Sequence, residues 1–137
     1  MNWNHKPANI YVIDDERIDN MIFKLLVKRL DEAIKVNAIE NGQHAIDQLL
    51  QLSRSEPSLL PDYIFLDINM PGMNGWQFLN EYDRLHIGQF KKIHIYILSS
   101  SVYGADVKKS HANPYVDDFI NKPLDFENLK MIFKMHN

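Results

Sequence analysis

The order of apolar segments along the 137 residues predicts an α/β fold: a three-layer, doubly wound arrangement in which helices cover both faces of a five-stranded parallel sheet. Three observations support this fold class. Short runs rich in β-branched residues alternate five times with segments whose apolar residues recur at helical spacing. Turn residues such as Asn41-Gly42 separate neighbouring segments. Aspartate, serine or lysine follows several runs directly, where a parallel strand would open onto a binding surface.

The short β-branched runs are the predicted strands. The first and third are apolar up to the point where aspartate follows, as expected for strands buried on both faces of a sheet. The predicted strands are Ile10–Ile13, Lys35–Ile39, Tyr63–Leu66, Ile93–Leu98 and Asp118–Asn121.

Helices are predicted between and after these strands. In Glu16–Leu30 the apolar residues that follow helical spacing are Ile18, Met21, Ile22, Leu25, Leu26 and Leu30. Lys28 and Arg29 in its last turn suit the helix macrodipole. Further helices are expected around Ala45–Leu52, Trp76–Leu85 and Ala105–His111, and after an N-cap at Asp125, with Ser53–Pro61 as a polar loop.

Composition and charge describe one ordinary globular domain, residues 1–137, with a core of about residues 8–136. A net charge of −3 gives no broad basic field for nucleic acid or anionic membrane. The absence of cysteine excludes disulfides and cysteine-based metal sites. No signal peptide and no run of roughly 20 apolar residues is present, so we expect a cytoplasmic protein without membrane attachment.

Polar side chains follow four of the five predicted strands. Asp14 and Asp15 follow the first, Asp67 the third, Ser99 the fourth and Lys122 the fifth. Because the carboxyl ends of parallel strands meet at one edge of a sheet, we expect these side chains to share a single shallow pocket.

This set of side chains suits phosphoryl transfer. Neighbouring carboxylates repel one another, and a hard cation such as Mg²⁺, which prefers oxygen ligands, relieves that repulsion. A lysine ammonium can bind phosphate, a serine hydroxyl can donate to a phosphoryl oxygen, and a carboxylate can form an aspartyl phosphate. The Met70-Pro71-Gly72 turn after Asp67 would let the backbone near Asn69 offer a carbonyl to the metal, and Asn74 is a candidate N-cap for the next helix.

At these positions the chain resembles the receiver domain of bacterial two-component response regulators, as a stand-alone domain. The matching segments are Ile13–Glu16 (IDDE), Leu66–Gly75 (LDINMPGMNG), Ile97–Ser101 (ILSSS) and Ile120–Leu124 (INKPL), each at a strand end. The resemblance covers about Ile10 to Met135 and implies a flavodoxin-like (βα)5 fold with strand order 2-1-3-4-5.

The resemblance also implies roles at the metal and phosphate site. Asp67 would be the phosphoacceptor and a metal ligand. Asp15 would bind Mg²⁺ directly, Asp14 through water, and Asn69 through its backbone carbonyl; Mn²⁺ could substitute for Mg²⁺.

The remaining roles concern the switch. Ser99 resembles the switch hydroxyl, although serine replaces the commoner threonine and three consecutive serines leave its register open. Lys122 resembles the phosphate-binding lysine, with Pro123 as a candidate cis-proline. Phe119 stands where the family places an aromatic that moves inward on activation.

The resemblance implies partners rather than a substrate. A histidine kinase or histidine phosphotransfer protein would supply the phosphoryl group, and a downstream protein target would read the face formed by the fourth helix, fifth strand and fifth helix. We expect no DNA-binding domain after the last helix, and no enzymatic activity beyond the domain's own phosphorylation and dephosphorylation.

Three other functions remain as alternatives. A Mg²⁺-dependent phosphatase with an aspartate nucleophile would place an acidic residue where Asn69 stands, and a flavin-binding protein would need a neutral phosphate loop where Asp14-Asp15-Glu16 stands. A degenerate receiver could act only as a binding module. The histidines show no metal-ligand spacing and are expected at the surface or at edges; they are His5, His44, His86, His94, His111 and His136.

Overall fold

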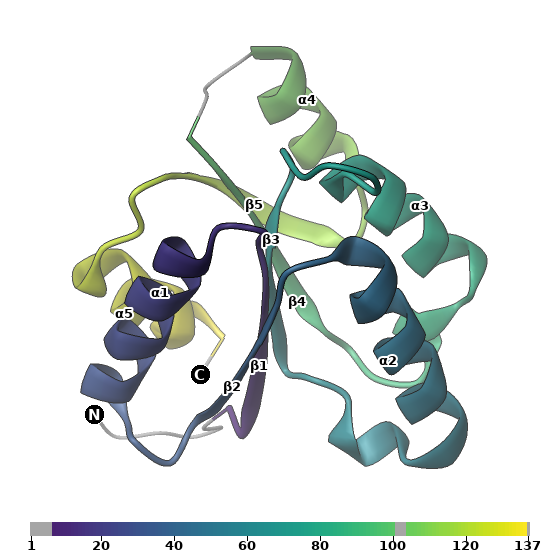
Figure 1. Ribbon diagram of the computed structural model, residues 1–137, viewed down its shortest axis with the longest axis horizontal. Coiled ribbons are helices and arrows are strands. Elements are labelled where there is room, and N and C mark those ends of the chain that lie inside the picture. Colours follow the sequence, from purple (N-terminus) through teal and green to yellow (C-terminus); the bar gives the residue numbers. More distant parts are fainter. Residues whose placement is uncertain (1–6, 101–103, 137) are drawn as a thin grey trace.

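In the computed structural model, which describes residues 7–100 and 104–136, five parallel strands form one sheet in the order β2-β1-β3-β4-β5 (Figure 1). This arrangement confirms the predicted flavodoxin-like α/β fold. The strands are β1 (Asn9–Ile13), β2 (Lys35–Ile39), β3 (Tyr63–Asp67), β4 (His94–Ser99) and β5 (Val116–Asn121).

Helices cover both faces of the sheet. Helices α1 and α5 lie on one face, and α2 and α3 lie on the other, with α4 beside β5 (Figure 1). Their bounds are α1 (Arg17–Leu30), α2 (Gly42–Ser55), α3 (Gly75–Arg84), α4 (Gly104–Ala112) and α5 (Phe126–Met135).

Each face of the sheet has its own apolar core. Alternate residues of β1 enter opposite cores: Ile10 and Val12 pack toward α1 and α5, while Tyr11 and Ile13 pack toward α2 and α3. Every residue of the central strand β3 is buried, which explains why its sequence is apolar without alternation.

Most element boundaries agree with the predictions to within one to three residues. The prediction of a polar loop over Ser53–Pro61 was wrong, because α2 continues to Ser55 and a 3₁₀ turn spans Pro57–Leu59. Proline at the first position of that turn is compatible with it, since the missing N–H would be unpaired there in any case.

Most of the apolar stripe of α1 faces away from the core, although Leu26 and Leu30 pack against it. The buried side chains of the helix belong to Asn20, Phe23 and Val27. By contrast, four residues of the predicted stripe are 48–71% exposed, namely Ile18, Met21, Ile22 and Leu25. Helical spacing therefore predicted the helix correctly, but most of the stripe lies on its outer surface.

The loop between β3 and α3 depends on two glycines. Gly72 has a positive φ of 74°, which a residue with a side chain rarely adopts. Gly75 donates its N–H to the carbonyl of Ile68 at 3.2 Å, and a Cβ at Gly75 would lie 2.7 Å from the Ile68 Cα. This close approach packs the start of α3 directly against the end of β3.

We expect Gly75→Ala to destabilise the protein by about 1–3 kcal/mol, because the added methyl group meets backbone rather than a flexible side chain. Urea denaturation measures the change. The matched control is Gly104→Ala, where a Cβ meets nothing within 4 Å, and we expect a change of at most about 1 kcal/mol in the stabilising direction. Equal effects of the two substitutions would contradict this account of the loop.

Candidate functional site

The predicted site residues gather at the carboxyl edge of the sheet. Asp14 directly follows β1, Asp67 ends β3, Ser99 ends β4, and Lys122 directly follows β5. The Lys122 N–H donates to the carbonyl of Ser99 at 2.8 Å, which continues the β4–β5 pairing into the site. Carboxylate oxygens of Asp14, Asp15 and Asp67 all lie within 4.8 Å of one another.

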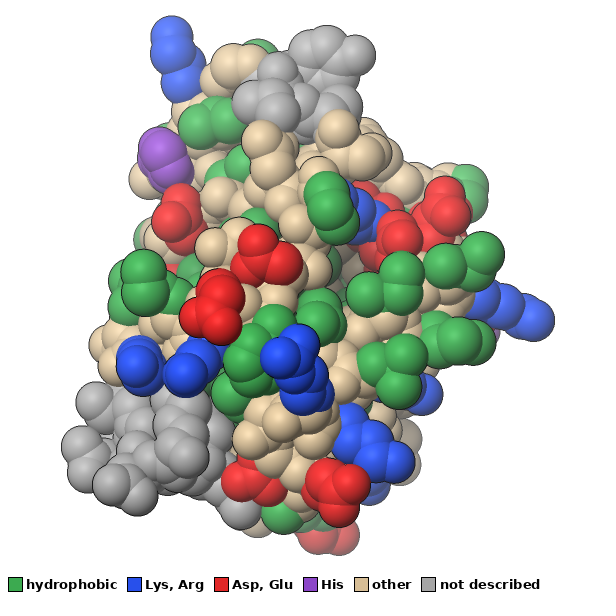
Figure 2. Space-filling model, turned by 90° about the vertical axis from the view of Figure 1, so that its left-hand side faces the viewer, with side chains coloured by type: hydrophobic (Ala, Val, Ile, Leu, Met, Phe, Trp, Pro, Cys, Tyr) green, Lys and Arg blue, Asp and Glu red, His purple; other side chains and the backbone are tan. Residues whose placement is uncertain are grey.

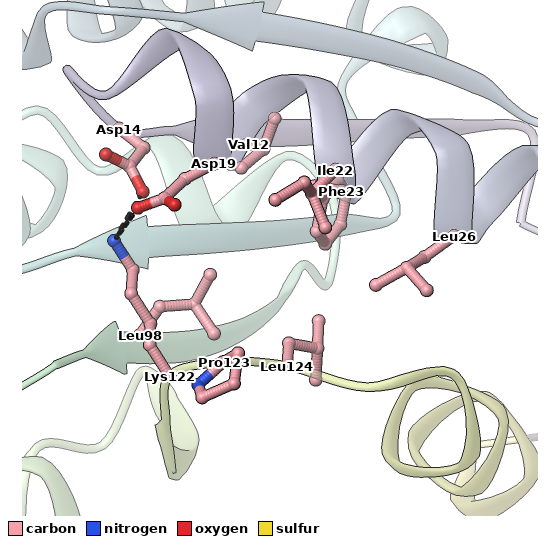
Figure 3. A pocket seen from close by; sticks show the side chains of 10 residues that line it. All are labelled: Val12, Asp14, Asp19, Ile22, Phe23, Leu26, Leu98, Lys122, Pro123 and Leu124. Carbon is pink, nitrogen blue, oxygen red and sulfur yellow. Dashed lines mark hydrogen bonds and ion pairs between the residues drawn. The ribbon is translucent and has the colours of Figure 1, made fainter.

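Lys122 provides the counter-charge for these carboxylates. Its Nζ lies 2.7 Å from Asp14 Oδ2, 3.0 Å from Asp19 Oδ2 and 3.7 Å from Asp67 Oδ2. Figure 3 shows the lysine side chain extending from the end of β5 toward Asp14 and Asp19. The role of Asp19 was not predicted, because an acidic residue in the first turn of a helix is explained by the macrodipole alone.

Asp14 is held in place by backbone groups. It is 1% exposed, and its Oδ1 accepts the N–H of Glu16 at 2.9 Å. Its own N–H donates to the carbonyl of Ile39, and its carbonyl accepts the side-chain amide of the buried Asn20 at 2.8 Å. Asn20 thus lies on the core face of α1, where its side chain fixes the end of β1. This role of Asn20 was not predicted.

Asp67 is linked to the neighbouring strand end through Asn69. The Asn69 N–H donates to Asp67 Oδ1 at 3.0 Å, and the Asn69 side-chain amide donates to Ser99 Oγ at 3.3 Å. Asp67 and Ser99 are buried, whereas Asn69 is exposed. Asn69 therefore connects the side chains at the ends of β3 and β4.

The surroundings shift the pKa values of both Asp67 and Lys122. Burial raises the pKa of Asp67 to about 6, with a further increase from Asp14 and opposing effects from the Asn69 N–H and Lys122. Burial alone would lower the pKa of Lys122, but hydrogen bonds to Asp14 and Asp19 and the charges of Asp14 and Asp67 raise it above its ordinary value. The lysine is thus charged at neutral pH, and metal-free Asp67 holds its proton more tightly than an ordinary aspartate.

The other predicted residues surround this centre. Asp15 is more exposed than Asp14 and Asp67, and the peptide bond between Lys122 and Pro123 is cis. Phe119 lies on β5, partly buried against the core beneath α2 and α3. Ser101, the third serine of the run, lies outside the described residues.

An apolar cavity of about 90 Å³ adjoins Asp14 and Lys122. Figure 3 shows its walls, to which α1 contributes Ile22, Phe23 and Leu26 and the segment after β5 contributes Pro123 and Leu124. The cavity connects the charged centre to the exposed stripe of α1 through Ile22.

Two of the histidines, which show no metal-ligand spacing along the sequence, are brought together by the fold. His94 begins β4 and His136 follows α5, and the fold brings both beside Asp117 of β5, with one ligand atom of each within 4.8 Å of the others. Their separation along the sequence hid this group. His5 lies outside the described residues.

Comparison with known proteins matches residues 10–134 to the response regulator receiver domain. The probable methanogenesis regulatory protein FilR2 of Methanothrix harundinacea is 26% identical over 90% of this chain and 77% of its own length. The chain spans only 28–33% of the length of several other curated relatives.

Solved structures agree with this match. A two-component response regulator from Cytophaga hutchinsonii superposes with a TM-score of 0.86 at 27% identity, covering 96% of this chain and 97% of that one. The receiver domain of the histidine kinase CKI1 from Arabidopsis thaliana, complexed with Mg²⁺, shares the fold with a TM-score of 0.79 at 21% identity, covering 95% and 92% of the two chains.

The chain therefore belongs to the response regulator receiver domain family of two-component signalling. Its pocket of Asp14, Asp15 and Asp67 fits the phosphoacceptor site of that family, and the oxygen donors present suit Mg²⁺. As a receiver domain it is not an enzyme apart from its own phosphorylation chemistry. Within the described part of the chain, no helix has the length and apolar character required to cross a membrane.

The raised pKa of Asp67 predicts how stability depends on pH in metal-free buffer. The folded protein favours the protonated form of Asp67. The stabilising contribution of this group to the free energy of unfolding is therefore complete below about pH 4 and is lost as the pH rises through about 6. We expect Asp67→Asn to raise the free energy of unfolding at neutral pH by on the order of 1–3 kcal/mol, with little difference near pH 4.

Urea denaturation in the presence of a chelator, repeated across this pH range, measures that difference. Asp47→Asn, at an exposed position on α2, is the control and should show no such pH dependence. A wild type that is at least as stable as Asp67→Asn at neutral pH without metal would contradict the interpretation.

Proposed function

We propose that Asp67 accepts a phosphoryl group from a phosphohistidine on a histidine kinase or histidine phosphotransfer protein, and that the domain works in the cytoplasm. The observation that carries this proposal is the arrangement of carboxylates within 4.8 Å of one another, with the Lys122 ammonium between them. A receiver domain implies a histidine kinase partner. The side chains supply a nucleophile, a cation site and a positive charge for the transferred group.

In the transfer step, an Asp67 carboxylate oxygen forms a bond to phosphorus while the phosphorus–nitrogen bond to the histidine breaks. The electron pair of the broken bond stays on the imidazole nitrogen. Mg²⁺, held by Asp15, Asp67 and the Asn69 carbonyl with Asp14 through water, would neutralise charge on the phosphoryl oxygens. Lys122 needs to move little, since its Nζ is already 3.7 Å from Asp67 Oδ2.

Phosphorylation of Asp67 would then change the positions of the Ser99 and Phe119 side chains. The buried Ser99 hydroxyl lies at the end of β4, where it could donate to a phosphoryl oxygen on Asp67. Phe119 on the adjacent β5 is only partly buried, so an inward movement would bury more of its ring. Movement of this pair would change the surface of α4, β5 and α5, where Met131 and Met135 are exposed and a groove separates β5 from α5.

The exposed stripe of α1 suits docking of the phosphodonor. Figure 2 shows hydrophobic side chains gathered on the face formed by α1 and α5. On α1 they are Ile18, Met21, Ile22 and Leu25, and Ile22 also lines the cavity beside Asp14 and Lys122. A partner covering this stripe would bring its phosphohistidine to the acceptor site. An apolar helical surface is the kind of partner that fits.

Intact-protein mass spectrometry tests the acceptor. With Mg²⁺ and acetyl phosphate we expect one added phosphoryl group on the wild type and none on Asp67→Asn, because the amide is no nucleophile toward phosphorus. Asp47→Asn is the matched control and should be phosphorylated like the wild type. A wild type that gains no phosphoryl group would instead favour a degenerate receiver that acts only as a binding module.

The stripe is tested with Leu25→Ser and Ile18→Ser. We expect each to lower kcat/KM for transfer from a phosphorylated histidine phosphotransfer protein by about tenfold, while the reaction with acetyl phosphate is unchanged. Phe90→Ser removes a comparably exposed apolar side chain outside α1 and serves as the control. Equal loss with both donors would show damage to the site rather than to docking.

A further inference from the structure

At the opposite edge of the sheet from the acceptor site, three potential metal ligands come together. His94 is the first residue of β4, Asp117 is the second residue of β5, and His136 directly follows α5. One ligand atom of each lies within 4.8 Å of the other two. The phosphorylation chemistry proposed above uses none of them, because its residues all stand at the carboxyl ends of the strands.

We propose that His94, Asp117 and His136 bind a divalent transition-metal ion of the Zn²⁺ class. Two imidazoles and one carboxylate are ligands typical of Zn²⁺ and its neighbours, whereas Mg²⁺ and Ca²⁺ prefer oxygen alone. Three protein ligands would leave a further position for water, and the partial exposure of the His94 and Asp117 side chains, 23% and 26%, gives solvent access to it.

The spacing of the donors is close to what an ion requires. His94 Nδ1 lies 3.2 Å from Asp117 Oδ2, a separation suited to two ligands that each lie about 2 Å from one metal. The His94 and His136 rings are stacked, with their centroids 3.6 Å apart and their planes inclined by 25°. Nearly parallel rings at this distance cannot both hold one ion in their own planes, so binding requires one imidazole to rotate toward the other two ligands.

Neighbouring groups orient two of the three ligands. Tyr96 Oη lies 2.6 Å from His136 Nε2, and when Nε2 donates its proton to Tyr96, Nδ1 is the unprotonated nitrogen of that ring. The Ile95 N–H donates to Asp117 Oδ2 at 3.1 Å and fixes that carboxylate. Partners of this kind commonly set the tautomer and direction of metal ligands. The site would tie the end of α5 to the amino ends of β4 and β5.

A Zn²⁺ binding measurement tests the proposal. The protein competes with a chromophoric chelator for Zn²⁺ in the presence of excess Mg²⁺. The Mg²⁺ keeps the acceptor-site carboxylates occupied, so that Zn²⁺ bound there is not counted. We expect one Zn²⁺ per chain, with at least about tenfold weaker binding in His94→Gln, His136→Gln and Asp117→Asn. His44→Gln removes an exposed histidine on α2 and should bind like the wild type.

Two further measurements separate ligation from a fold defect. Tyr96→Phe keeps the ring and all three ligands, and we expect about tenfold weaker binding from loss of the orienting hydroxyl alone. At a hundredfold excess of Zn²⁺ over its Kd, the wild type should melt roughly 10 °C higher, and folded His94→Gln/His136→Gln should not. The proposal would be overturned if the wild type bound no Zn²⁺, or if the double variant bound Zn²⁺ as tightly as the wild type.

Discussion

The position of one ammonium group determines how the acceptor site can exist at all. Carboxylates at the ends of β1 and β3 are buried close together, which would be prohibitive for unpaired charges. Lys122 makes this arrangement stable because it contacts Asp14 and Asp19 directly and stays within 3.7 Å of Asp67. The compensation is incomplete, as the raised pKa of Asp67 shows. That remaining cost is physically useful, since a divalent cation or an incoming phosphoryl group finds a carboxylate that gains from a new partner.

The sheet delivers these groups by register. Parallel pairing of β1 with β3, of β3 with β4 and of β4 with β5 brings their carboxyl ends to one edge, and the Lys122–Ser99 backbone bond extends that alignment beyond the last strand. The close packing of Gly75 on Ile68 then lets α3 begin directly beside the end of β3, just after Asp67. Backbone geometry thus brings the carboxylates and the ammonium group of Lys122 to the same edge of the sheet.

Much of this was predictable from the sequence. Strand and helix alternation gave the fold class, and polar residues directly after strands identified Asp14, Asp15, Asp67, Ser99 and Lys122, because parallel strands share one functional edge. Asp19 and Asn20 were missed for a physical reason. Both stand in a helix, where an acidic first turn or a single polar residue has ordinary local explanations. Asp19 takes its role from Lys122, 103 residues away, and Asn20 from the carbonyl of Asp14 at the end of β1, and neither partner is encoded in the helical pattern.

Contacts between distant segments also explain the two surfaces that were not predicted from the sequence, namely the exposed stripe of α1 and the histidine group. Periodicity reveals that α1 has an apolar stripe but not whether the sheet or a partner covers it, and here the sheet instead packs against Asn20, Phe23 and Val27. An apolar stripe that the fold leaves exposed beside the acceptor site supports the proposed docking of a phosphodonor protein there. The histidine group follows the same logic at the other edge, because ligands 42 residues apart, from His94 to His136, become neighbours only when α5 returns along the sheet. One sheet can therefore present a phosphoryl site at its carboxyl edge and a candidate metal site at its amino edge, and β4 and β5 contribute to both sites.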